Sequence, residues 1–188
     1  MTTTLFTNAH IATGEPGSTA ASTLPLQDIL VTDGVFTAFG PGLAQQYEAQ
    51  GGDLAAIEVV DLGGKLVCPP FCDTHLHLDY VFTARKPGAV NESGTLFEGI
   101  QRWSETKSDL TVDEIKQRAK IGIKKEMLHG VQLIRSHADV TDPNLTSLKA
   151  LLELKEELKD TVTLQIVSFP QEGMYSYEGP HGESGAED

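Results

Sequence analysis

Apolar runs and helix-forming segments alternate after Pro70, and this alternation restricts the fold of the 188-residue chain more than any other feature. The runs "VQLIRSHADV" and "TVTLQIVSFP" are typical of buried strands, and a shorter apolar run ends at Phe71. A strand, helix, strand, helix, strand order with these spacings predicts a parallel sheet or barrel in the α/β class. Because the strands are almost continuously apolar, we expect both faces of the sheet to be buried.

Two helices are predicted between these strands. The first spans about residues 111–129: Thr111 and Glu114 form a capping-box sequence, and Gly130 provides a left-handed stop. The second starts at Asp142-Pro143, with proline at the first helical position. One side of this second helix carries Leu145, Leu148, Leu152 and Lys155.

Residues 1–65 read as short strands. In "DILVTDGVFTAFG" two apolar runs are joined by Asp33-Gly34, the favoured pair for a tight hairpin turn. The stretch "AIEVVDLGGKLVCPP" repeats this pattern with Gly63-Gly64 at the turn. The final stretch, "YEGPHGESGAED", is turn-rich and acidic and predicts no packed element.

The charge balance bears on the partners of the protein. The chain has 27 acidic and 14 basic residues, a formal charge of −13, which argues against nucleic acid or an anionic membrane but not against a neutral nucleobase. No apolar run reaches the roughly 18 residues that span a bilayer, and the N-terminus lacks the basic start and apolar core of a secretion signal. With two cysteines only four positions apart, we expect a cytoplasmic protein without disulfides.

The stretch "CPPFCDTHLHLDY" places His75 and His77 at the end of the first apolar run. Alternate residues of a strand face the same side, so the two imidazoles lie roughly 6.5–7 Å apart along the chain. Neutral imidazoles at that spacing can both reach one cation, because metal–nitrogen bonds are about 2.0–2.1 Å long. In a barrel this position is the carboxyl-end mouth, where active sites collect. The sequence therefore predicts a metal site at His75 and His77.

Cys68 and Cys72 suggest a rival site, a structural Cys2His2 zinc centre that uses the same two histidines. On a regular strand, however, even and odd positions face opposite ways, so the thiols point away from the imidazoles. A Cys-x3-Cys spacing is also unusual for zinc. We therefore expect both cysteines to be small, buried, apolar residues.

Other polar residues after the strands carry weaker signals. His137 either lines the same mouth as His75 and His77 or is a core histidine bonded to backbone. Gln171 has a carboxamide that suits the edge of an amide-like heterocycle, although a solvated glutamine fits as well. Glu172 is a solvated charge or an acid–base group. No further role is predicted for the remaining histidines, His10, His129 and His181.

Four blocks of the sequence, in order, resemble the amidohydrolase superfamily and, within it, the bacterial-type cytosine deaminases. They are "LVCPPFCDTHLHLD", "NESGTLFEGIQRW", "RSHADV" and "LQIVSFPQEG". The resemblance covers most of residues 60–177 and is far more specific than His-x-His alone. The small zinc deaminases are excluded because they need Pro-Cys-x-x-Cys, which does not occur here.

The resemblance implies a (β/α)8 barrel, of which residues 66–188 hold about three of eight strands, preceded at residues 1–65 by strands of a small β-sandwich. It implies one divalent metal ion, Fe²⁺ or Zn²⁺, that activates water to attack an amidine carbon and release ammonia. His75 and His77 match the two metal ligands of the first strand. Gln171 matches the glutamine that reads the amide edge of a pyrimidine, and Leu96 matches a position whose backbone contacts the base.

The sequence also departs from the family pattern. Pro70 and Cys72 replace the usual glycine and the usual Ile or Val. The family's third metal histidine, acid–base glutamate, later histidine and last-strand aspartate all follow the "FPQEG" block in family order, so no catalytic residue is assigned in this chain. Two ligands without the remaining shell hold a metal poorly. We therefore expect a truncated, split or fragment product that is inactive alone.

Alternatives stay open on substrate and role. The substrate could be another cyclic amidine or amide, such as isoguanine, creatinine or a triazine, because one glutamine does not determine the ring. A different role is a non-catalytic product whose unpaired strands bind a complementary C-terminal chain. A large homo-oligomer is usual in the family that the chain resembles.

Overall fold

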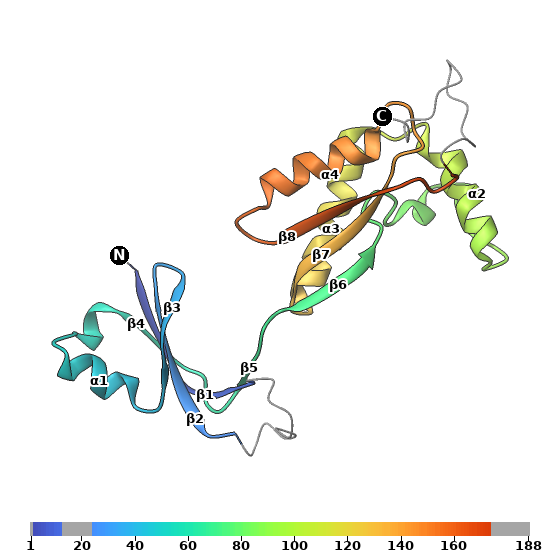
Figure 1. The fold of residues 1–188 in the computed structure, drawn as a ribbon. Coiled ribbons are helices and arrows are strands. Elements are labelled where there is room, and N and C mark those ends of the chain that lie inside the picture. The colour runs from blue at the N-terminus through green and yellow to red at the C-terminus, as the bar shows by residue number, and fades with distance from the viewer. Residues whose placement is uncertain (1, 13–23, 174–188) are drawn as a thin grey trace. The chain divides into compact units, whose positions relative to one another are not determined.

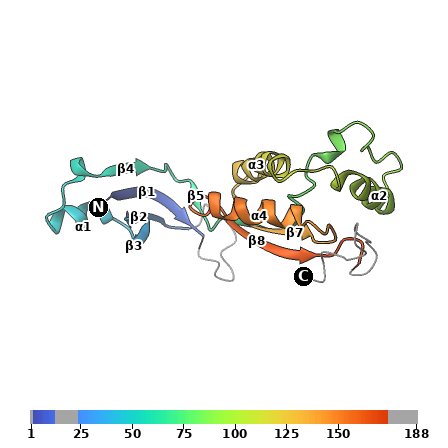
Figure 2. The same ribbon diagram turned by 90° about the horizontal axis from the view of Figure 1, so that it is seen from above.

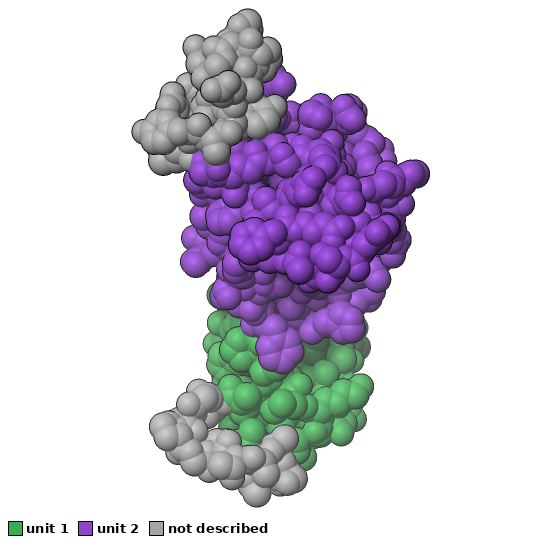
Figure 3. Space-filling model, turned by 90° about the vertical axis from the view of Figure 1, so that its right-hand side faces the viewer, with its two compact units in different colours: residues 1–69 green, residues 70–188 purple. Residues whose placement is uncertain are grey.

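The computed structural model describes residues 2–12 and 24–173. The chain forms two compact units, Met1–Pro69 and Pro70–Asp188 (Figure 3). The acidic stretch at residues 177–188, with His181, lies outside the described residues. Within the described ranges, no helix combines the length and the apolar character that crossing a membrane requires.

The first unit is a five-stranded mixed sheet with the order β3-β2-β1-β4, to which β5 adds by pairing with β1. Its strands are β1 (Thr3–Ile11), β2 (Leu26–Thr32), β3 (Val35–Gly40), β4 (Glu58–Asp61) and β5 (Leu66–Val67). Helix α1 (Leu43–Ala49) and the 3-10 turn η2 (Leu54–Ala56) come between β3 and β4. The hairpin of β2 and β3 is confirmed, and Asp33 and Gly34 adopt the positive φ values, 50° and 78°, of a tight primed turn.

The second hairpin, predicted at Gly63-Gly64, does not form. Instead, β4 and β5 both pair with β1 in parallel, one after the other. The two glycines, with φ values of 57° and 78°, let the chain continue along β1, where the Gly64 N–H donates to the Asn8 carbonyl at 2.8 Å. Pairing with a central strand therefore outweighs the local turn signal. That this sheet belongs to a β-sandwich stays a prediction.

The second unit confirms the predicted alternation of strands and helices. Its strands β6 (Phe71–Leu76), β7 (Val131–Asp139) and β8 (Thr163–Phe169) form a parallel sheet in that order. Helices α3 (Val112–Leu128) and α4 (Thr146–Glu157) connect the strands and pack on one face of the sheet (Figure 1 and Figure 2). The 3-10 turn η3 (Thr83–Arg85) and helix α2 (Leu96–Lys107) come between β6 and α3, and no sequence pattern predicts α2.

Helix α3 begins and ends where the sequence predicts. The Thr111 hydroxyl accepts from the Glu114 N–H at 3.2 Å, and the Glu114 carboxylate accepts from the Thr111 N–H at 3.1 Å. Beyond the helix, Gly130 has a φ of 85°, and its carbonyl accepts from the Phe71 N–H at 2.9 Å. This turn leads the chain directly from α3 into β7, beside β6.

Helix α4 begins at Thr146, not at Pro143 as predicted. The Asp142 carboxylate accepts from the N–H groups of Asn144 (3.0 Å) and Thr146 (3.1 Å), which forms a turn ahead of the helix. Of the four residues predicted to share one side of the helix, Leu148 packs against the core, whereas Leu152 is 48% exposed. Packing selects a neighbouring stripe, and the buried residues of α4 are Ser147, Ala150, Leu151 and Leu154.

The core of the second unit lies between the sheet and its helices. Its largest fully buried apolar members are Leu78, Ile115, Ile134, Leu151 and Leu154. The opposite face of the sheet is open: Leu133 is 40% exposed, and Arg135 and Gln165 are exposed too. The prediction of burial on both faces is therefore wrong for the described part of this unit, whose helices pack on the other face.

Replacing Leu151 by alanine is expected to lower the free energy of unfolding by about 2–5 kcal/mol, because this fully buried side chain leaves a cavity. Leu152→Ala, on the same helix but 48% exposed, is the matched control and should change it by about 0.5 kcal/mol or less. Urea unfolding followed by circular dichroism measures both. Equal losses at the two positions would contradict the packing of α4.

Candidate active site

Three histidines meet at the carboxyl ends of β6 and β7. The ring centroid of His75 lies 5.3 Å from that of His77 and 4.3 Å from that of His137. Phe169, at the end of β8, packs its ring edge-on against His77 and His137. The structure thus brings the two predicted ligands together and places His137 at the same mouth.

The two predicted ligands reach this mouth because β6 is irregular. Asp73 pairs with Ile134 and Leu76 with Ser136, so β6 uses one more residue than β7 over this stretch. The Asp73 carboxylate accepts from the His75 N–H at 2.9 Å, which stabilises the bulge. The extra residue shifts the alternation of side chains, and His75 comes to lie beside His137.

The ring of His77 is oriented by backbone. Its Nδ1 lies 3.0 Å from the carbonyl oxygen of His137. A carbonyl only accepts, so Nδ1 carries the proton in the neutral ring and Nε2 keeps its lone pair. Histidines that bind metal commonly donate their second ring N–H in this way. The hydrogen bond therefore leaves Nε2 as the ring nitrogen through which His77 would hold a metal ion.

Burial favours the neutral form of two of the three imidazoles, those of His77 and His137. It lowers the pKa of His77, against the raising effect of the bond to the His137 carbonyl. It also lowers the pKa of His137, to which nearby His75 contributes. Neutral imidazole is the form that binds metal, and the rings of His75 and His77, with 5.3 Å between centroids, are close enough to serve as two ligands of one divalent ion. Among the described residues, no group of three or more His, Cys, Asp or Glu side chains is placed to hold one.

Gln171 and Leu96, which are far apart in the sequence, line one pocket of about 400 Å³. Tyr80 and Trp103 also line it, and the Tyr80 ring stacks on His77 with 4.6 Å between centroids. The pocket therefore adjoins the histidines, and its volume is within the range of small-molecule sites. Its other lining residues are Asn91, Gly94, Thr95, Gly99 and Ile100.

Helix α2 lines this pocket with its first turns. The loop before α2 is held by Glu98, whose pKa is lowered to about 2 by hydrogen bonds from the Ser93 hydroxyl and from the N–H groups of Ser93 and Glu92. Thr95 caps the helix by accepting from the Glu98 N–H at 3.3 Å. The Leu96 N–H belongs to the first turn, whose N–H groups have no partner within the helix. It is therefore a candidate donor to a ligand in the pocket.

A buried charge cluster next to the pocket was not predicted. Asp139, at the end of β7, accepts from Trp103 Nε1 (2.6 Å), Lys107 Nζ (3.2 Å) and the Thr141 hydroxyl (2.6 Å). Burial opposes ionisation of Asp139, but the bonds from Thr141, Lys107 and Trp103 outweigh it and lower the pKa. Asp79 accepts from the Asp139 N–H at 2.8 Å, and burial raises its pKa to about 6.

Glu172 belongs to the same cluster and is not the solvated charge that was one of its two predicted roles. Its side chain is 16% exposed, and its Oε1 lies 2.9 Å from Lys107 Nζ. Asp79, Asp139 and Glu172 each stand at or just after the end of a strand. Because the carboxyl ends of parallel strands meet at one edge, this spacing is the sequence signal by which the cluster could have been found.

Cys68 and Cys72 are exposed free thiols, so the prediction that they are buried is wrong. The bulge between Asp73 and Leu76 also breaks the regular alternation on which the argument against a Cys2His2 centre rested. That centre nevertheless finds no support, because the described residues include both thiols and both imidazoles yet contain no group that could hold a metal through three or more ligands.

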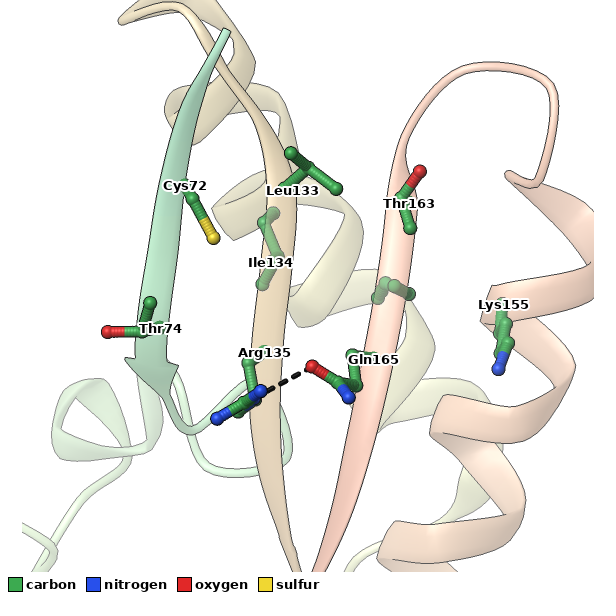
Figure 4. Close-up of a pocket in the computed structure, with 9 residues that line it drawn as sticks. Cys72, Thr74, Leu133, Ile134, Arg135, Lys155, Thr163 and Gln165 are labelled. Atoms are coloured by element: carbon green, nitrogen blue, oxygen red, sulfur yellow. Dashed lines mark hydrogen bonds between the residues drawn. The ribbon is translucent and has the colours of Figure 1, made fainter.

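A second hollow, of about 350 Å³, lies on the three-stranded sheet (Figure 4). Cys72 and Thr74 of β6, Arg135 of β7 and Gln165 of β8 line it, and Arg135 Nε donates to Gln165 Oε1 at 2.7 Å. None of the predicted site residues lies in it. The predicted site residues therefore lie at the histidines and in the pocket beside them, not in this second hollow.

A parallel β/α unit with its polar side chains gathered at the carboxyl ends of the strands has the arrangement of a barrel enzyme. The chain belongs to the amidohydrolase family, which matches residues 58–188. Similarity to solved members confirms that the fold is the N-terminal part of an amidohydrolase (β/α)8 barrel protein.

Three relatives illustrate the family. The crystal structure of 5-methylcytosine deaminase from Klebsiella pneumoniae, liganded with 5-fluorocytosine, has a TM-score of 0.75 and 40% identity over 95% of this chain and 38% of that one. N-isopropylammelide isopropyl amidohydrolase of Pseudomonas sp. (strain ADP) is 35% identical over 120 residues, 62% of this chain and 30% of the relative. Pterin deaminase of Rhizobium rhizogenes (strain K84 / ATCC BAA-868) is 27% identical over 152 residues, 78% of this chain and 32% of the relative. The chain thus spans about a third of the length of the curated relatives.

The orientation of His77 can be tested by NMR. We expect long-range ¹H–¹⁵N correlations to show the neutral ring of His77 with its proton on Nδ1, because the His137 carbonyl lies 3.0 Å from that nitrogen. His129, exposed at the end of α3, is the control and should not favour Nδ1 in this way. A proton on Nε2 of His77 would contradict its preparation as an Nε2 ligand.

Proposed function

We propose that this chain supplies two metal ligands and a ring-binding surface of a metal-dependent hydrolytic deaminase, with cytosine as the substrate. The observation that carries the proposal is that Gln171 and Leu96 share one pocket, which adjoins His77 through Tyr80. Gln171 and Leu96 belong to separate blocks of the sequence. That both line one small-molecule pocket supports a role for the two residues in binding the ring.

The relatives support a cyclic nitrogen compound as the substrate. The 40% identical structure is a 5-methylcytosine deaminase with 5-fluorocytosine bound, which favours a pyrimidine. The second candidate is another cyclic amidine or amide, of the isoguanine, creatinine or triazine type. The similarity to an enzyme named for N-isopropylammelide favours this alternative.

The reaction proposed is the replacement of an exocyclic amino group by oxygen. The oxygen of water adds to the ring carbon that bears the amino group, and the carbon–nitrogen bond breaks. One proton of the water completes the ammonia, and the other stays on the ring nitrogen of the product. A divalent metal, Fe²⁺ or Zn²⁺, supplies a water whose pKa is lowered toward neutrality.

The side chains of this chain would bind and orient the ring. The Gln171 carboxamide both donates and accepts, which matches an N–H and a carbonyl side by side on a pyrimidine edge. The Leu96 N–H offers a further donor at the start of α2. Tyr80 and Trp103 supply flat apolar surface against which a ring can stack. The free thiols of Cys68 and Cys72 fit a protein that works in a reducing cytoplasm.

Metal binding tests the ligand assignment. We expect His75→Ala and His77→Ala each to weaken Zn²⁺ binding about tenfold or more, because each removes one of two imidazole ligands. Isothermal titration with Zn²⁺ measures this. His129→Ala removes an exposed histidine at the end of α3 and should leave binding unchanged. Unaltered Zn²⁺ affinity in a variant that carries both His75→Ala and His77→Ala would overturn the assignment of these histidines as metal ligands.

Ring binding tests the substrate class. We expect 5-fluorocytosine to bind to the purified chain, and Gln171→Leu to weaken that binding about tenfold or more, because a polar edge loses its partner. Gln117→Leu, at an exposed position on α3, is the matched control. Isoguanine, creatinine and a triazine are titrated in parallel. Tighter binding of one of these would favour the alternative substrate class over cytosine.

A further inference from the structure

Lys107 is a buried cation at the last position of α2. Its side chain is 3% exposed, and its Nζ reaches Asp139 Oδ2 (3.2 Å), the Thr141 hydroxyl (2.6 Å) and Glu172 Oε1 (2.9 Å). An ammonium group is costly to bury unless it is paired and hydrogen-bonded. The contacts with Asp139, Thr141 and Glu172 therefore restrict where the end of α2 can lie.

These partners come from different elements of the second unit. Asp139 ends β7, whereas Glu172 follows β8 in the loop that also carries Gln171. Asp139 also accepts from Trp103, one turn before Lys107 on α2, at 2.6 Å. Trp103 and Asp139 thus hold α2 against β7, while Glu172 attaches the loop after β8 to α2.

The pocket lies between the same two elements. α2 lines it with Leu96 and Trp103, and the loop after β8 contributes Gln171. Glu172 is the next residue in the chain after Gln171. The Lys107–Glu172 ion pair therefore joins the end of α2 to the residue next to Gln171, although neither charged residue lines the pocket.

We propose that Lys107 and Glu172 are positioning residues, which hold Gln171 against α2 and so set the width of the ring-binding pocket. This inference rests on the proposed function for its ligand, a planar cyclic amidine such as a pyrimidine. It adds a pair of residues outside the pocket whose charges control ring affinity through Gln171. A ring that binds between the Leu96 N–H and the Gln171 carboxamide fits only if these two groups are held at the right distance from each other.

Glu172→Gln is the main test, because Lys107 keeps Asp139 as a partner and the fold is retained. We expect the dissociation constant for 5-fluorocytosine to rise about tenfold, the effect of losing one charge-assisted contact. Zn²⁺ affinity and the melting temperature should stay near those of the original chain. Glu156→Gln makes the same substitution in an exposed ion pair, with Lys159, and should change none of the three.

A double-mutant cycle separates positioning from a general loss of stability. If Lys107 and Glu172 act on the pocket only through their mutual contact, the double variant Lys107→Met/Glu172→Gln should weaken 5-fluorocytosine binding no more than Lys107→Met alone. Additive losses would overturn the proposal. So would a dissociation constant for Glu172→Gln equal to that of the original chain.

Trp103 provides a readout that needs no ligand. It is the only tryptophan of the chain and lines the pocket. We expect Glu172→Gln, but not Glu156→Gln, to increase quenching of its fluorescence by acrylamide, because a looser loop admits the quencher. If the original chain binds no heterocycle, the proposed function fails while the quenching result still decides whether Lys107 and Glu172 position the loop. Unchanged quenching in Glu172→Gln would then contradict the positioning role of Lys107 and Glu172.

Discussion

The buried carboxylate of Asp139 is the contact on which the mouth of the sheet depends. It ends β7, accepts from Trp103 and Lys107 of α2, and its own N–H donates to Asp79 after β6. Leaving a buried charge without any partner costs about 3–5 kcal/mol, so moving α2 away from Asp139 would be strongly unfavourable. Trp103 packs against Tyr80, with 4.8 Å between centroids, and Tyr80 stacks on His77. The charge cluster, the pocket and the histidines are therefore one packed assembly.

Backbone contacts position the histidines of that assembly, which are proposed to bind the metal ion. The bulge in β6 brings His75 beside His137, and the His137 carbonyl orients the ring of His77. Both effects bring imidazole nitrogens to the carboxyl ends of the strands, where barrel enzymes place their chemistry. The pocket proposed to bind the ring, by contrast, is built by side-chain contacts between α2 and the loop after β8.

Some of this could be predicted from local sequence because the physical cause is local. The capping box at Thr111, the left-handed Gly130 and the Asp33-Gly34 hairpin each depend on a few neighbouring residues, and all three form. The predictions that failed depend on distant partners. The start of α4 is delayed by the Asp142 carboxylate, and the turn at Gly63-Gly64 yields to pairing with β1. Cys72 is exposed because its strand lies at the edge of a sheet with one open face.

The sequence by itself determined the α/β alternation, the family and the identity of His75, His77, Leu96 and Gln171 as candidates, because these follow from periodicity and from short blocks in order. Only the tertiary structure decided that Leu96 and Gln171 share a pocket and that Lys107 joins Asp139 to Glu172. Residues separated by tens of positions meet because the carboxyl ends of parallel strands lie at one edge of the sheet. The spacing after the strands marks the carboxylates as candidates, but only the fold brings the buried cation of Lys107, at the end of α2, into contact with Asp139 and Glu172.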